Sequence, residues 1–208
     1  MKEIIIYALL FICSTLSVYA DYRIVFLNTP TIRINGKEHR LNDTFNPEAS
    51  VEWQSDRQAM KIVDTNTGEQ RLLVASQYRK AKSVSVSDFI VGVKHLSSRG
   101  NGPQTISSLR TILNNHFFYT DSIRVESRIP TDDKRFFYVS YIYNGEEINK
   151  LVPNESGSFI ISNEIFKIDG SPITPFETTL NVYYIDEIKD TVTLVSDSMY
   201  ITPIPDSL

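Results

Sequence analysis

The segment Arg135-Phe136-Phe137-Tyr138-Val139-Ser140-Tyr141-Ile142-Tyr143-Asn144-Gly145 decides the fold of the C-terminal half of this chain. Its aromatic and β-branched residues favour a long strand, and the Asn-Gly pair that follows is the strongest short signal for a tight hairpin turn. Alternate side chains of a strand point to opposite faces, so Phe137, Val139 and Tyr141 share one face and Phe136 and Tyr138 the other. If the first set faces the core, Phe136 and Tyr138 are outward aromatics that suit a partner contact. Burial of both faces, between sheets or domains, is the alternative.

Other short strands follow the same pattern from about Asp121 onward. Each is bounded by Gly, Pro, Asn or Asp, which favour turns and so end strands. The expected strands are Ser122–Glu126, Glu147–Val152, Phe159–Ile161, Ile165–Ile168, Leu180–Ile185, Val192–Val195 and Tyr200–Ile201. About seven strands over residues 119–208 predict an immunoglobulin-like β-sandwich. It is not the antibody type, because this region holds no cysteine pair and no tryptophan.

The N-terminal half, residues 21–98, also reads as short strands. The expected strands are Arg23–Leu27, Thr31–Ile34, Val51–Trp53, Met60–Asp64, Gln70–Val74 and Ser83–Val86. Asn35-Gly36 supplies the positive φ angles of a hairpin turn, and Thr65–Glu69 forms a hairpin loop with a late glycine. This spacing predicts a small β-barrel or an open sandwich.

The middle of the chain, residues 99–118, is predicted to be a linker and a short helix. Ser97–Pro103 is the longest cluster of small, turn-forming residues. After it, Ile106, Leu109, Leu113 and their neighbours repeat at helical spacing behind Thr105, a suitable N-cap. A weaker helix is expected after Ser87.

Residues 1–20 have the pattern of a signal peptide. Lys2 precedes an apolar run from Ile4 to Cys13, and the small residues at Val18 and Ala20 predict cleavage between Ala20 and Asp21. Lipid attachment at Cys13 is disfavoured, because bulky residues precede this cysteine. It is the chain's single cysteine, so disulfides and thiolate chemistry are not expected in the exported protein. The absence of disulfides favours a bacterial periplasm or cell surface, and no later segment is long and apolar enough to span a membrane.

Charge is distributed unevenly between the two halves. Residues 21–100 carry 12 Lys and Arg against 9 Asp and Glu, whereas residues 101–208 carry 8 against 15. The balance changes from +3 to −7 at the expected linker, which supports two domains. An acidic exported protein of this kind is not expected to bind nucleic acid.

The string from Thr131 to Tyr141, followed by Tyr143-Asn144-Gly145-Glu146, resembles a family of uncharacterised exported proteins of Gram-negative bacteria. This resemblance covers about the last 110 residues. The N-terminal strands resemble the small β-domain of FecR-type periplasmic regulators. Both resemblances imply two β modules in a bacterial envelope, and neither transfers a functional residue.

The sequence predicts no catalytic, metal or cofactor site. His39, His95 and His116 are far apart and lack the spacing of zinc ligands. The serines are outside the motifs that mark hydrolase nucleophiles. The acidic pairs Asp132-Asp133, Glu146-Glu147 and Asp186-Glu187 adjoin expected turns, where carboxylates are ordinarily solvated.

Two further patterns suit contact or modification. The basic run containing Arg79, Lys80 and Lys82 lies between expected strands and suits an acidic partner or an anionic glycan, although a solvated loop is the simpler interpretation. The triplets beginning at Asp121, Asp190 and Asp197 have the form Asp-Ser/Thr-apolar, which resembles O-glycosylation sites of some Gram-negative bacteria.

Binding is the function that these patterns favour. We expect a non-catalytic exported envelope protein that binds another envelope protein or a surface glycan, with Phe136, Tyr138, Arg79, Lys80 and Lys82 as contact residues. Two alternatives stay open: an exported hydrolase, or a subunit of one, with a site at the domain interface, and a periplasmic sensor that feeds a regulator.

Overall fold

The computed structural model describes residues 21–94, 105–155 and 158–208. About half of the chain lies in strands, so the prediction of a mainly β fold is confirmed. The chain divides into two compact units, Met1–Lys94 and His95–Leu208, each with its own hydrophobic core. The expected signal peptide, Cys13, Ala20, His95 and most of the expected linker lie outside the described residues. Within the described ranges, no helix is long and apolar enough to cross a membrane.

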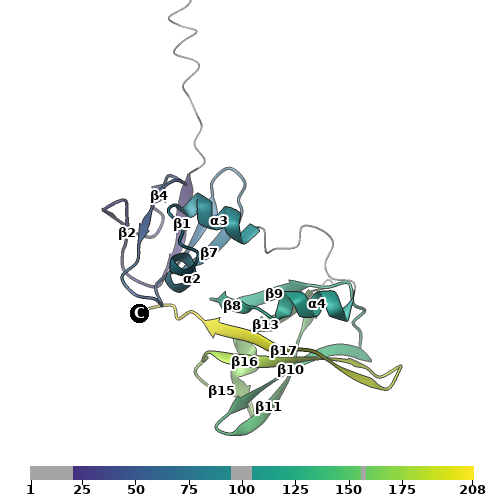
Figure 1. The fold of residues 1–208 in the computed structure, drawn as a ribbon. Helices are drawn as coiled ribbons and strands as arrows, with labels where there is room; N and C mark the ends of the chain where they lie inside the picture. Colours follow the sequence, from purple (N-terminus) through teal and green to yellow (C-terminus); the bar gives the residue numbers. More distant parts are fainter. Residues whose placement is uncertain (1–20, 95–104, 156–157) are drawn as a thin grey trace, which may run out of the picture. The chain divides into compact units, whose positions relative to one another are not determined.

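Over its described residues, 21–94, the N-terminal unit contains two open antiparallel sheets and two helices (Figure 1). One sheet has the order β4-β1-β6-β7 and the other β3-β2-β5. The strands are β1 (Tyr22–Leu27), β2 (Ile32–Ile34), β3 (Lys37–His39), β4 (Thr44–Phe45), β5 (Val51–Glu52), β6 (Ala59–Asp64) and β7 (Gln70–Val74). The helices are α2 (Ala75–Lys80) and α3 (Val86–Lys94). The sheets do not close, so of the two predicted forms the open arrangement is observed and the barrel is not.

Two hairpins of this unit form where the sequence predicted them. Asn35 and Gly36, between β2 and β3, have φ angles of 48° and 75°. These angles lie in the left-handed region, which glycine and asparagine adopt more readily than other residues. The loop between β6 and β7 turns at Gly68, with a φ angle of 72°. In both cases the turn residues fix the register of the strands that they join.

The segment after β7 differs from the prediction. Ser83–Val86 is not a strand, because Val86 begins α3. Ser85 stabilises the start of this helix: its Oγ accepts a hydrogen bond of 3.2 Å from the amide of Asp88. Helix α2 was not predicted, and it has no side-chain cap. The alternation of serine and valine over residues 83–86 indicated a strand, but a pattern of four residues is too short to distinguish a strand from the start of a helix.

The C-terminal unit is a sandwich of a five-stranded and a three-stranded sheet (Figure 1). The larger sheet has the order β11-β10-β16-β17-β8 and the smaller β12-β13-β9. Their strands are β8 (His116–Tyr119), β9 (Ser122–Glu126), β10 (Arg135–Tyr143), β11 (Glu146–Leu151), β12 (Asn154–Glu155), β13 (Ser158–Ser162), β16 (Thr178–Asp186) and β17 (Thr191–Pro203). A short 3₁₀ helix η1 (Asn163–Phe166) and the pair β14 (Lys167–Ile168) and β15 (Ser171–Pro172) connect β13 to β16.

This strand order is that of an immunoglobulin-like sandwich. In the lettering of that fold, β12, β13 and β9 take the places of D, E and B, while β11, β10, β16 and β17 take those of C′, C, F and G. Strand β8 comes first in the chain, as A does, but it pairs in parallel with β17 in the larger sheet and not with β9 in the smaller one. Buried aromatic and aliphatic side chains of both sheets form the core, among them Phe137, Phe159 and Tyr141.

Helix α4 (Ile106–Leu113) belongs to the C-terminal unit, although the sequence placed it with the linker. Thr105 is its N-cap, as predicted, and accepts a hydrogen bond from the amide of Ser108. Leu109 and Leu113 are fully buried in the core of the sandwich. Arg110 donates hydrogen bonds to the backbone carbonyls of Leu194 and Val195 in β17, at 2.7 and 2.8 Å. The helix therefore satisfies polar groups of β17 that β8 does not pair.

Two buried tyrosines of this core are expected to respond differently to removal of the hydroxyl group. Tyr141 donates a hydrogen bond of 2.7 Å to the carbonyl of Ile165, whereas the Tyr119 hydroxyl has no partner among the described residues. Tyr141→Phe should lower the free energy of unfolding by about 1 kcal/mol, while Tyr119→Phe should leave it unchanged or raise it. Urea unfolding followed by circular dichroism measures both. Equal losses in the two variants would show that Tyr119 has a hydrogen-bond partner.

Candidate functional site

Alternate side chains of strand β10 point to opposite faces of the sheet, as the sequence predicted. Phe137, Val139 and Tyr141 are buried in the core of the sandwich. Phe136 and Tyr138 lie on the opposite face of the five-stranded sheet and are partly exposed. The smaller sheet covers the inner face, so the face carrying Phe136 and Tyr138 is the outer face of the sandwich.

Neighbouring strands extend this outer face into a continuous apolar surface. Directly opposite residues in an antiparallel sheet share a face, so one row across the sheet is Leu151, Tyr138, Tyr183 and Leu194. A second row is Phe136, Ile185 and Val192. We call these seven residues the outer apolar strip. They come from β10, β11, β16 and β17.

The strip leaves large apolar side chains in solvent. Leu151 is 67 % exposed, Val192 63 % and Leu194 39 %. Ile142 and Ile188, on β10 and in the turn between β16 and β17, are also exposed. Scattered single apolar residues on a surface are ordinary, but a contiguous exposed group marks an interaction site.

Two tyrosines stack at the centre of the strip. The rings of Tyr138 and Tyr183 are nearly parallel, at 9°, with centroids 4.7 Å apart. Burial raises the pKa of the Tyr138 phenol, and the neighbouring Tyr183 and the carboxylate of Glu147 raise it further. At neutral pH Tyr138 therefore keeps its proton and presents an O–H group beside apolar ring edges.

The predicted basic contact residues lie in the other unit, on and after α2. The Arg79 guanidinium donates to the carbonyl of Trp53 at 2.7 Å and pairs with Asp56 at 2.5 Å. Lys80 ends α2, and Lys82 follows it with a φ angle of 50°; both are exposed. Arg79 therefore has a structural role that the sequence did not reveal, whereas Lys80 and Lys82 remain available for contact.

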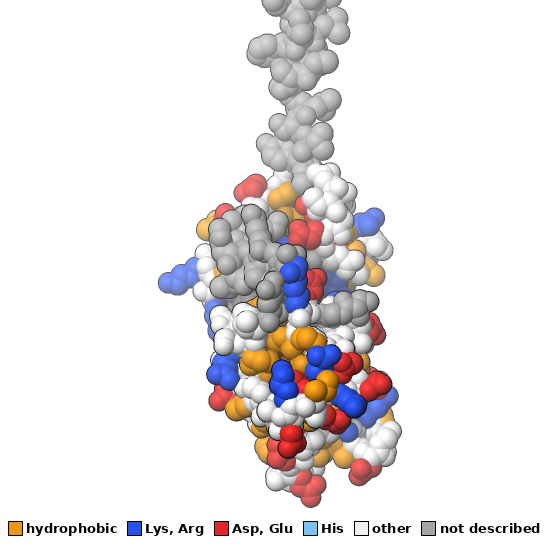
Figure 2. All heavy atoms as spheres, turned by 90° about the vertical axis from the view of Figure 1, so that its right-hand side faces the viewer, with side chains coloured by type: hydrophobic (Ala, Val, Ile, Leu, Met, Phe, Trp, Pro, Cys, Tyr) orange, Lys and Arg blue, Asp and Glu red, His pale blue; other side chains and the backbone are white. Residues whose placement is uncertain are grey.

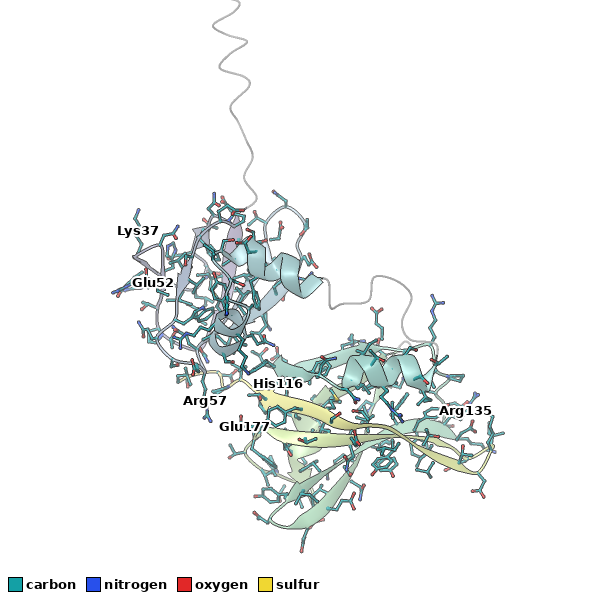
Figure 3. All side chains as sticks on the ribbon, in the orientation of Figure 1. Lys37, Glu52, Arg57, His116, Arg135 and Glu177 are labelled. Atoms are coloured by element: carbon teal, nitrogen blue, oxygen red, sulfur yellow. The ribbon has the colours of Figure 1, made fainter. Side chains whose placement is uncertain are left out.

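The two described histidines lie in different units, and each contacts neighbours of its own unit. His39 in β3 lies 3.9 Å from the carboxylate of Asp43. In β8, His116 hydrogen-bonds Thr202 at 2.8 Å and packs against Phe118 and Tyr200. Figure 3 shows His116 and Arg135 at different ends of the C-terminal unit. Among the described residues, no group of three His, Cys, Asp or Glu is arranged to hold a metal ion.

Two of the predicted acidic positions take part in charge pairs at the start of β10. Asp132 accepts hydrogen bonds from Arg135, which hold the pKa of its carboxyl below the usual value. Asp186 lies opposite Arg135 in register and pairs with Lys189 at 3.1 Å. Burial alone would raise the pKa of Asp186, but the hydrogen bonds from Lys189 outweigh it and the pKa is lowered. Both carboxyls are thus ionised at neutral pH, the opposite of what a general acid requires.

The three Asp-Ser/Thr-apolar triplets present their hydroxyl residues on the surface. Ser122 begins β9, Thr191 begins β17, and Ser198 lies at an irregularity in the pairing of β17; all three are exposed. Their exposure is compatible with modification. It does not distinguish these residues from other surface serines and threonines.

Positive and negative side chains are mixed on one face of the molecule. On the face drawn in Figure 2, basic and acidic side chains are interspersed with hydrophobic ones, so neither sign forms a continuous field there.

Comparisons with models of protein families, with curated proteins and with solved structures found no match. The outer apolar strip is therefore the strongest candidate site on structural grounds alone.

The sequence identified Phe136 and Tyr138 but missed the other five residues of the strip. Tyr183 and Ile185 were predicted on a strand, yet nothing placed that strand beside β10. Leu151, Val192 and Leu194 appeared only as members of short strands. Alternation within the segment Leu180–Ile185 was the available signal, since it puts Tyr183 and Ile185 on one face.

Proposed function

We propose that this protein is a non-catalytic exported envelope protein that binds another protein through the outer apolar strip. The observation that carries the proposal is the exposure of Leu151, Val192 and Leu194 around two stacked tyrosines. Aromatic side chains at the centre of an interface often contribute most of its binding energy, and the contacts around them exclude water. Export to the periplasm or the cell surface rests on the signal-peptide pattern of residues 1–20.

The arrangement of the rings favours a protein over a glycan. A sugar ring binds by lying flat on the open face of an aromatic ring. Tyr138 and Tyr183 turn their faces toward each other, and Leu151 and Leu194 lie next to them in register. The surface offered to solvent thus consists of ring edges, hydroxyls and aliphatic groups, which suits an apolar protein surface.

Ionised acidic groups support a binding role over catalysis. Asp132 and Asp186 have lowered pKa values and are each paired with a base. General acid catalysis by a carboxyl group needs a raised pKa, as in a site that excludes water.

The double variant Leu151→Ser/Val192→Ser tests the proposed contact. Both side chains are well exposed, so the fold should be retained, while a partner in envelope extract should bind at least about tenfold more weakly. Binding is measured by retention of that partner on the immobilised chain and, after its purification, by titration calorimetry. Leu41→Ser/Val84→Ser is the matched control, because these residues are 53 % and 76 % exposed in the other unit. Equal retention by the strip variant and the wild type would refute the proposed contact.

A further inference from the structure

We propose that the partner of the outer apolar strip presents an apolar centre surrounded by lysine and arginine side chains. This inference rests on the proposed function and adds the chemistry of the partner's surface. It comes from the charges that border the strip, and a second copy of this chain is the alternative occupant.

Acidic residues border the strip on several sides. Glu147 lies opposite Ile142 in register, on the outer face of β11. Glu187 and Asp190 lie in the turn between β16 and β17, next to Val192, and Asp197 lies on β17. All four are exposed, and none forms an ion pair with another described residue. Their charges are therefore free to act on a partner.

Five of the eight lysines and arginines in residues 105–208 are already engaged. Lys189 in the turn pairs with Asp186, Arg135 with Asp132, Arg124 with Glu155 and Lys167 with Glu164. Arg110 is held by carbonyls of β17. Of the other three bases, Lys134 lies beside Glu187, whose amide donates to the Lys134 carbonyl, Lys150 lies opposite the buried Val139, and Arg128 follows β9. The four unpaired acidic residues therefore outnumber the unpaired bases beside the strip.

This border disfavours self-association and favours a basic partner. Residues 101–208 carry 15 acidic residues against 8 basic ones. Two copies packed face to face would bring their acidic borders together, and like charges across an interface are costly. A basic border on the partner would instead accelerate association and make it sensitive to salt.

Two synthetic peptides provide the test. Both alternate the same Val, Leu and Tyr residues with a charged residue, which is Lys in one and Glu in the other. Fluorescence anisotropy should show binding of the Lys peptide to the wild-type chain, weaker in about 0.5 M salt than in about 0.05 M salt. The Glu peptide should bind at least about tenfold more weakly.

Charge-reversal variants separate the border from the overall charge. Glu147→Lys/Glu187→Lys should weaken binding of the Lys peptide about tenfold. Glu38→Lys/Glu126→Lys changes the net charge equally at exposed glutamates of β3 and β9, which are not strands of the outer apolar strip, and should leave binding unchanged. Equal effects of the two variants, equal binding of both peptides, or no binding of either would overturn the inference.

Two further outcomes distinguish the inference from the proposed function. If Leu151→Ser/Val192→Ser abolishes binding of the Lys peptide while Glu147→Lys/Glu187→Lys does not weaken it, the proposed contact is supported and the inference of a basic partner is refuted. If the strip variant binds the Lys peptide as tightly as the wild type does, both the proposed contact and the inference of a basic partner are refuted. Sedimentation velocity covers the alternative occupant: a dimer of the wild-type chain that the strip variant loses would identify a second copy and overturn the basic partner.

Discussion

Replacing Phe137 by alanine is expected to lower the free energy of unfolding of the C-terminal unit by about 3–5 kcal/mol. Phe137 is 1 % exposed, and its ring lies 4.9 Å from that of Phe159 and 5.0 Å from that of Tyr184. Alanine would leave a cavity where the two sheets meet. Because a whole domain is stable by only about 5–15 kcal/mol, this single loss is a large fraction of the total.

The two units can be followed separately in this experiment. Trp53 is the single tryptophan of the chain and packs against Tyr78 in the N-terminal unit, so its fluorescence reports that unit. In urea, Phe137→Ala should shift the transition seen by circular dichroism and leave the Trp53 transition in place. Phe136→Ala, one residue away on the outer face, is the matched control and should cost less. If the Trp53 transition shifts with Phe137→Ala, the two units unfold as one.

Features that depend on a few neighbouring residues could be predicted from the sequence. The alternation of β10 and the Asn144-Gly145 turn follow from strand geometry and from the φ angles of 52° and 85° that these two residues adopt. Thr105 begins α4 because its side chain can accept a backbone hydrogen bond. In each case the local sequence and the final structure agree.

Features that depend on distant contacts could not be predicted. Helix α2 lacks a capping side chain, and burial of Ala75 and Tyr78 in the N-terminal unit is what favours it. The basic run was therefore placed between strands. Arg79 is oriented by Trp53 and Asp56, more than 20 residues earlier in the chain, a relation that no local pattern reveals.

The outer apolar strip illustrates the same limit. Its rows follow from the order of β11, β10, β16 and β17 and from two shifts in the register between β16 and β17. A shift of one residue moves a side chain to the other face of the sheet. Alternation predicted that Phe136 and Tyr138 share a face, but only the register brings Tyr183 and Leu194 beside them.

Asn28→Ala is expected to destabilise the N-terminal unit by about 2–4 kcal/mol. Asn28 follows β1 and is 1 % exposed. Its Nδ2 donates to the carbonyl of Arg57 at 2.9 Å, and its Oδ1 accepts from the amide of Ala59 at 2.8 Å. Alanine would remove both bonds and leave the buried Ala59 amide at the start of β6 without a partner. Loss of a hydrogen bond whose other member stays buried costs more than the bond itself contributes.

Trp53 fluorescence in urea measures this loss, and the circular-dichroism transition of the C-terminal unit should stay in place. Asn46→Ala is the matched control, since Asn46 is exposed and its Oδ1 accepts one bond of 2.8 Å from the amide of Glu48. Water can replace that bond, so the control should cost less than about 1 kcal/mol. Equal losses in the two variants would mean that the Asn28 side chain contributes no more than a surface turn, and that backbone bonds and the bonds of Gln58 hold the segment from Arg57 to Ala59.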